Sequence, residues 1–346
     1  MEPPRSKENL ARQGSRDTLN LMRKAVFILI SLSLLAALAE GIVLAQVHIN
    51  PWRLAALLVC LSLVLGAFVG LTFASFVKQL RHWALVSAWA AFLMPFALLI
   101  PYVVYALGTR TFAILGLAKL TAYIAAPTAL LLPDRLRRAE GAGWRDFAAM
   151  LALALPVGAG WLEGIWTWPQ ELYVFRPFTS VCVGAYAFLV IRNLEGVGYR
   201  LTWRKGDLID SLSNFVAFAL LAIPLGIWLG FLHPHANPIS VWEIAFQFMG
   251  IYLTIAIPEE LLFRGILQNF LVRSITRGPR GVYGLLIASV IFGASHLHHP
   301  PVPNWKYGIL AALAGVFYGN AYRTRQRLSA SALTHTLVDT AWHFWF

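Results

Sequence analysis

The sequence has little charge and almost no cysteine. Only 13% of its 346 residues are charged and 58% are apolar, which gives a mean hydropathy of +0.65. A soluble domain cannot bury so large an apolar share, because part of any globule faces water. The two cysteines, Cys60 and Cys182, lie inside separate apolar runs, which excludes a disulfide framework or a zinc knuckle. The composition predicts an integral membrane protein.

Acidic residues are also scarce. Sixteen Asp and Glu stand against 28 Lys and Arg, so the net charge is +12. In a soluble protein this excess would suggest nucleic-acid binding. Here the basic residues fall almost wholly between apolar runs, which is typical of membrane topology. We therefore expect the lipid bilayer, and no nucleic acid, among the partners of the chain.

The apolar runs are long enough to count as membrane spans. Because a helix needs about 20 apolar residues to cross a bilayer, we predict an all-α fold, a polytopic transmembrane helix bundle of about eleven spans. The runs lie at 25–46, 54–77, 83–107, 112–132, 147–166, 177–191, 210–232, 241–258, 283–297, 306–322 and 329–346. Lys and Arg concentrate in alternate loops, which predicts a cytoplasmic N-terminus. We expect a multi-pass protein of the cell membrane, of the bacterial inner-membrane type.

The polar residues divide the chain into three parts. Residues 1–24 form a basic cytoplasmic tail, and residues 25–191 form an N-terminal transmembrane bundle to which we assign no role. Residues 192–346 form a core that carries the candidate chemistry. Within that core, a single helix over 241–272 would be about 48 Å long, too long for one crossing. We expect Pro258 to break it, or 260–272 to bend along the interface.

Two adjacent acids stand inside an apolar segment of this core. A charge in the bilayer centre costs about 2.5–3.5 kcal/mol, so ionisable groups within spans are candidates for function. On a helix, Glu260 shares a face with Arg264, four residues on, whereas Glu259 points about 100° away. We therefore expect Glu260 and Arg264 to pair and Glu259 to remain free for other work.

Two further motifs follow. His296 ends an apolar run, and the small residues just before it allow another helix to approach closely. His335 and Asp339 are four apart, so the carboxylate can accept from the imidazole. If the segments are helical, Glu259 and His296 lie about 20 Å from the same cytoplasmic turn. We therefore expect these polar groups to converge.

Carboxylates and imidazoles around one wet cavity suit amide hydrolysis. Glu259 would act as a general base on a water that His296 shares. His335 with Asp339 would stabilise the oxyanion of the tetrahedral intermediate. The alternative is a catalytic zinc ion on Glu259, His296 and His335, although the chain lacks the helical HExxH motif. Ser295 is adjacent to His296 and does not face it on a helix, so we expect no serine nucleophile.

The three motifs resemble the signature of the CPBP family, the CAAX-prenyl-protease and bacteriocin-processing intramembrane peptidases, also called the Abi family. That signature is EExxxR, then FxxxH, then HxxxD or HxxxN, on successive transmembrane segments. The chain matches it from Glu259 to Arg264, from Phe292 to His296 and from His335 to Asp339. The resemblance covers about residues 210–346 and implies an intramembrane endopeptidase.

The resemblance also implies roles. Glu259 is the catalytic carboxylate and acts with His296, while Glu260 and Arg264 orient the site. His335 and Asp339 support the oxyanion. The family is described as metalloprotease and also as glutamate-activated; we favour the second, expect no cofactor and keep zinc as the alternative. The expected substrate is a membrane-anchored protein or peptide that undergoes C-terminal processing or sorting.

Two other functions use the same residues. A membrane transporter or channel would line an ion path with them. A non-catalytic immunity or binding protein would keep only the scaffold. Substituting Glu259 separates these readings, because a peptidase loses product, a transporter loses flux and a scaffold loses little.

Overall fold

The computed structural model describes residues 50–137, 141–235, 240–275 and 281–346. Within these ranges the chain is helical and contains no strand, so the all-α fold is confirmed. The expected cytoplasmic tail, 1–24, and the expected first span, 25–46, lie outside the described residues.

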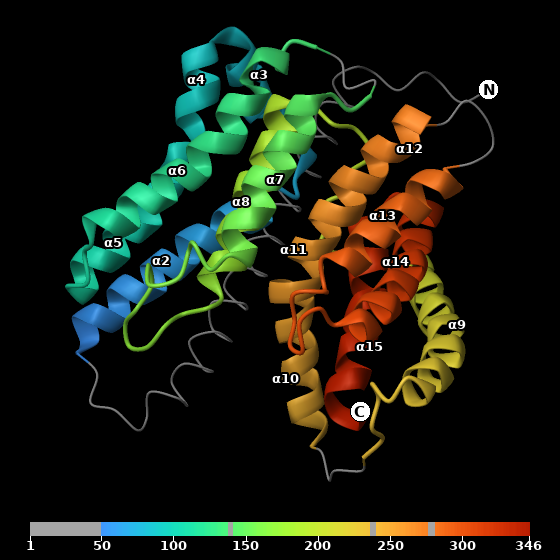
Figure 1. Ribbon diagram of the computed structural model, residues 1–346. Coiled ribbons are helices and arrows are strands. Elements are labelled where there is room, and N and C mark those ends of the chain that lie inside the picture. The colour runs from blue at the N-terminus through green and yellow to red at the C-terminus, as the bar shows by residue number, and fades with distance from the viewer. Residues whose placement is uncertain (1–49, 138–140, 236–239, 276–280) are drawn as a thin grey trace, which may run out of the picture.

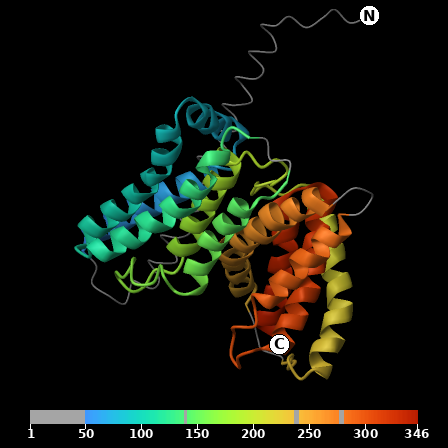
Figure 2. The ribbon, with the colours of Figure 1, turned by 45° about the horizontal axis from the view of Figure 1, so that its top comes forward.

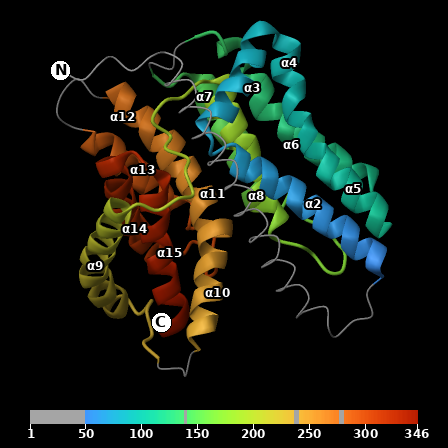
Figure 3. The ribbon, with the colours of Figure 1, turned by 180° about the vertical axis from the view of Figure 1, so that it is seen from behind.

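The helices gather into two groups, blue to green and yellow to red in Figure 1, and the same division is seen from two other directions (Figure 2, Figure 3). The first group holds α2 (Pro51–Gly70), α3 (Ala74–Val86), α4 (Ala88–Leu93), α5 (Leu99–Thr109), α6 (Ile114–Leu131), α7 (Trp144–Gly158) and α8 (Phe175–Ala185). The second holds α9 (Lys205–Trp228), α10 (Val241–Ile251), α11 (Ile257–Glu260), α12 (Asn269–Ile275), α13 (Val282–Ala294), α14 (Trp305–Arg325) and α15 (Leu328–Trp345). The predicted domain boundary near residue 191 falls between the groups and stays a prediction.

Five helices in the described ranges are long and apolar enough to cross a membrane. They are Pro51–Gly70, Ala88–Thr109, Ile114–Asp134, Lys205–Trp228 and Val241–Ile275. Large apolar side chains such as Trp89, Leu220 and Val290 are exposed on the outside, where lipid would cover them. The chain is a multi-pass membrane protein. The total of about eleven spans and the cytoplasmic N-terminus stay predictions.

Two of the expected spans end early. The run 147–166 is helical only to Gly158, because the chain then turns through Gly160 and Gly164, whose φ angles of +67° and +73° suit glycine alone. The run 54–77 is interrupted after Gly70, and α3 begins at Ala74. Hydropathy predicts both segments as continuous because it does not register turns in the backbone.

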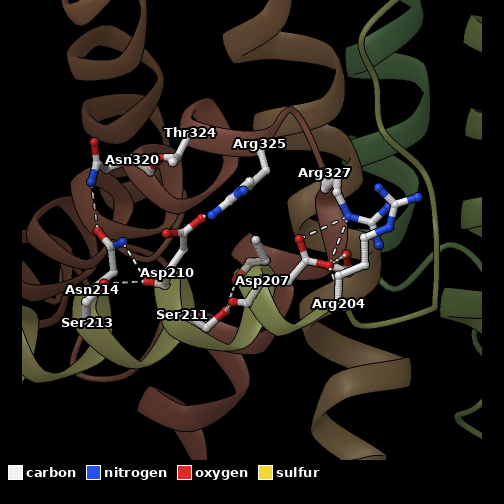
Figure 4. Close-up of polar contacts among 12 residues, drawn as sticks. Arg204, Asp207, Asp210, Ser211, Ser213, Asn214, Asn320, Thr324, Arg325 and Arg327 are labelled. Carbon is white, nitrogen blue, oxygen red and sulfur yellow. Dashed lines mark hydrogen bonds and ion pairs between the residues drawn. The ribbon is translucent and has the colours of Figure 1, made fainter.

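Asp207 and Arg327 fix the start of α9 to the start of α15 (Figure 4). The Arg327 Nε–H donates to both Asp207 oxygens, at 2.9 and 3.0 Å, and both side chains are buried. The hydroxyl of Ser329 donates to the same carboxylate at 3.3 Å. One turn on, the Ser211 hydroxyl donates to the carbonyl of Ala330 at 2.7 Å. These bonds lock α9 against the helix that carries the last predicted motif.

The same face of α9 also binds α14. Arg325 Nε lies 2.6 Å from Asp210 Oδ2, and Asn320 donates to the side-chain oxygen of Asn214 at 3.0 Å (Figure 4). Below this polar layer the contact between the helices turns apolar, with Phe218 of α9 packing on Phe317 of α14. Polar contacts thus join the start of α9 to the start of α15 and the end of α14, and apolar contacts follow further along α9.

Candidate active site

The two glutamates lie on a helix that changes pitch on both sides of them. α10 passes into π-helical turns at Tyr252–Ala256, returns to α-helix at Ile257–Glu260 and widens again at Leu261–Gln268. Pro258 therefore does not break the helix, and the expected break there is wrong, whereas a bend of 260–272 along the interface stays a prediction. Pro258 has no amide hydrogen, and the adjacent wide turn accommodates that loss without ending the helix. π turns are frequent at functional sites.

Glu260 is completely buried and fully partnered. Its Oε2 lies 3.2 Å from Arg264 Nε, which is the pair that the spacing of four predicts. The Nδ1–H of His335 donates to Oε1 at 2.9 Å, and the hydroxyl of Ser331 donates to Oε2. Because both oxygens are engaged by side chains of α15, Glu260 is placed to join its own helix to α15 and not to meet a substrate.

Arg264 is buried beneath the site. Its guanidinium carbon lies 4.2 Å from the ring centre of Phe292 and 5.3 Å from that of Tyr318. Its Nη2 donates to the carbonyl of Gly315 at 3.4 Å. A buried charge is tolerable only when it is paired, and here the carboxylate of Glu260 and two aromatic faces surround it. The pair holds α13 and α14 against the glutamate helix, the continuous helix Val241–Ile275 that carries Glu259 and Glu260.

Glu259 is placed differently. Its side chain is 34% exposed and borders a cavity of about 400 Å³. Among the described residues, its Oε2 has no hydrogen-bond partner, and it lies 4.0 Å from His335 Nε2. A carboxylate that is desolvated and unpartnered is available as a base. The predicted contrast between the two adjacent glutamates is thus found.

His296 enters the same cavity from the end of α13. Its Nδ1–H donates to the carbonyl of Phe292 at 2.8 Å, and this bond leaves Nε2 as the acceptor nitrogen. Tyr307 packs edge-on against the ring, with centroids 4.7 Å apart. Gly293 lets α13 lie close to α14 at this point. A Cβ added to it would lie 2.5 Å from the carbonyl oxygen of Gly308, so no larger residue fits without a shift.

His335 lies among three carboxylates, those of Glu259, Glu260 and Asp339. Nδ1 is bonded to Glu260, and Nε2 lies 3.3 Å from Asp339 Oδ2, one turn further along α15. Its ring stacks on Tyr318, with centroids 4.5 Å apart and planes at 16°. A ring with both nitrogens directed at carboxylates is held in one orientation at the cavity wall.

The structure therefore brings all six predicted residues together, in two layers. Glu259, His296, His335 and Asp339 border the cavity. Glu260 and Arg264 lie behind them, joined to the cavity layer through His335. The remaining wall is largely apolar and aromatic, from α9, α14 and α15.

Comparison with known families agrees with this layout. Residues 240–341 match the family model described as type II CAAX prenyl endopeptidase Rce1-like. This segment is similar to the Rce1-like family. The match runs from α10 to the last helix and contains all six predicted residues, so the resemblance that the three motifs carry is confirmed for that segment. No curated protein and no solved structure matches the chain.

The match supports a protease in the Rce1-like segment, and it leaves the catalytic roles of individual residues as predictions. It does not extend to α2–α8, nor to α9, which nevertheless contributes Phe218 and Ala222 to the cavity wall.

Sequence reasoning missed several residues of the Rce1-like site. Ser331 bonds Glu260, and its signal was available, since it lies four residues before His335 on the same helical face. Tyr318 stacks on His335, and Tyr307 borders the cavity beside His296. Nothing in the sequence distinguishes these two tyrosines from the other aromatics of the chain.

The arrangement does not suit the alternative zinc set of Glu259, His296 and His335. A histidine binds metal through a nitrogen lone pair, and both nitrogens of His335 are directed to carboxylates. Among the residues that the structure describes, no group of three or more His, Cys, Asp or Glu side chains is arranged to hold a metal ion. We derive no step through a metal.

Proposed function

We propose that the chain is an intramembrane endopeptidase in which Glu259 activates water against a peptide bond of a membrane-associated protein. The observation that carries this proposal is the contrast between the neighbours: Glu260 is closed off by three partners, whereas Oε2 of Glu259 accepts no hydrogen bond in the described structure and has only His335 Nε2, at 4.0 Å, as a close opposite charge. A carboxylate oxygen that is buried without a hydrogen bond is costly, and such groups persist where they serve chemistry.

The reaction follows from the placement of the groups. A water held between Glu259 and the free Nε2 of His296 loses a proton to Glu259 as its oxygen attacks the peptide carbonyl. The resulting oxyanion develops near the positively charged edge of His335, which Asp339 orients. Glu259 then gives its proton to the leaving nitrogen, the C–N bond breaks, and a carboxylic acid and an amine leave.

The apolar wall of the cavity suits a substrate segment that is itself lipid-soluble. The family description names CAAX prenyl endopeptidases, which favours cleavage near the C-terminus of an anchored protein. We propose C-terminal processing or sorting of this kind in the cell membrane. A transporter is less well supported, because Glu260 and Arg264 form a closed ion pair at the base of the cavity and not a continuous polar path.

The test compares cells that carry the wild-type chain with cells that carry Glu259→Gln, in which the carboxylate is lost and the shape is kept. New protein termini in the membrane fraction are identified by mass spectrometry. We expect a defined set of termini that disappears with Glu259→Gln. The control is Glu243→Gln, at the start of the same helical run and outside the cavity. Identical termini in all three strains would contradict the proposal.

A further inference from the structure

A second cavity, of about 350 Å³, lies against the opposite side of the glutamate helix. Its far wall comes from the first helix group, through Val157 of α7 and Pro177 and Ser180 of α8. Its near wall contains Ile255 and Glu259, and both of these residues also border the first cavity. The two cavities therefore meet at the carboxylate-bearing residue.

Apart from Glu259 and Tyr173, the polar side chains that line this second cavity are engaged by other groups. The hydroxyl of Ser180 accepts from Tyr123 at 2.7 Å, and that of Thr254 donates to the carbonyl of Gly250 at 2.8 Å. Arg176 pairs with Glu163 at 2.9 Å. What remains open in the wall is apolar, including Val157, Val174 and Pro177. The cavity accordingly suits an apolar occupant, and its volume lies in the range of about 300–1,000 Å³ usual for binding pockets.

We propose that this second cavity is a substrate subsite: it receives apolar side chains of the peptide on one side of the scissile bond, while the first cavity receives the other side. The inference rests on the proposed function. A peptide whose carbonyl lies beside Glu259 must continue in both directions, and the two cavities provide a space on each side of that residue. The first helix group thereby selects the substrate.

The subsite is tested by changing the size of the side chain at residue 157 and measuring which substrate residues are accepted beside the cut. Val157→Trp fills the cavity and Val157→Ala enlarges it. Leu155→Trp is the matched control, since it lies on the same helix, is exposed and borders neither cavity. Each variant is expressed as the full chain, and the residues flanking the Glu259-dependent cuts are compared.

We expect Val157→Trp to reduce cutting next to bulky apolar residues by about tenfold or more, on one side of the bond only, because one methylene in an apolar pocket is worth about 10–200-fold. Val157→Ala should admit larger residues at that position, and Leu155→Trp should match the wild type.

If both Val157 variants keep the wild-type preference for the residues beside the cut, the subsite is overturned. This is the result expected if the cavity holds lipid and not substrate. The subsite is also overturned if Val157→Trp cuts nothing while Val157→Ala keeps the wild-type preference. In that case the tryptophan has only disturbed folding. Absence of any Glu259-dependent cut in the wild type would instead remove the proposed function.

Discussion

His335 donates to Glu260 across 2.9 Å, and this bond joins the last helix to the helix that carries both glutamates. The same imidazole reaches toward Asp339 on its other side. The site is therefore built around one ring whose two nitrogens are fixed by carboxylates from two helices. Glu260 supports the site from behind, while Glu259 is left at its surface.

The two adjacent glutamates should differ in their effect on stability. Glu260→Gln leaves the buried guanidinium of Arg264 without its counter-charge, and breaking a buried pair costs about 3–5 kcal/mol. Glu259→Gln removes no hydrogen bond in the described structure and should leave the unfolding temperature close to that of the wild type. Thermal unfolding of both purified variants in detergent checks this. Equal destabilisation by the two substitutions would contradict the assignment.

His296 should matter more than its neighbour His299, although both border the cavity. His296 uses Nδ1 for the carbonyl of Phe292, which leaves Nε2 as the acceptor nitrogen in the cavity that Glu259 also borders, whereas the exposed His299 packs at a tilt against Tyr307. We expect His296→Asn to lower the cleavage rate by at least about 10²-fold, the contribution usual for a positioned acid or base. His299→Asn should stay within about tenfold of the wild type. Rates measured on one substrate decide between them, and the reverse order would be inconsistent with the proposed water position.

Activity should not depend on a bound metal. Because Nε2 of His335, the nitrogen that zinc would use, lies 3.3 Å from Asp339 Oδ2 while Nδ1 is bonded to Glu260, we expect His335 not to bind zinc. We expect purified active protein to contain much less than one zinc per chain and to keep its rate in a strong chelator. One zinc per chain, with activity lost on chelation and restored by zinc, would refute this.

The contacts that hold α9 should be unequal in strength. Asp207→Asn weakens a buried pair with Arg327 and should destabilise the protein by about 3–5 kcal/mol. Asp210→Asn is the matched control, since its partner Arg325 is half exposed and such pairs contribute about 0–1 kcal/mol. Unfolding of the two variants in detergent gives the comparison. A larger loss for Asp210→Asn would show that burial does not set the strength of these pairs.

Local spacing was sufficient to predict part of this site. The pairs Glu260–Arg264 and His335–Asp339 are each four residues apart, and both contacts are present. The divergence of Glu259 from Glu260 follows from the helical turn in the same way. Equal depth in the bilayer also predicted that Glu259 and His296 would reach one cavity, as they do.

What sequence could not predict depends on tertiary packing. The wide turns around Pro258 keep the helix continuous where a proline alone suggests a break. The bond between His335 and Glu260 joins residues far apart in the chain, and no spacing rule applies to it. The cavity formed by Val157 and Glu259 likewise requires that α7 pack beside the glutamate helix, which hydropathy does not specify.

The most direct test of the account is hydrolysis by purified protein in lipid vesicles, carried out in ¹⁸O-labelled water with a substrate found by the comparison of termini. We predict that the wild type releases two fragments and that the new carboxyl terminus contains one ¹⁸O atom. Glu259→Gln should lower that rate by about 10²–10⁴-fold while the protein remains folded. Cleavage by folded Glu259→Gln at the wild-type rate would contradict the central claim, because Glu259 would then not activate the water.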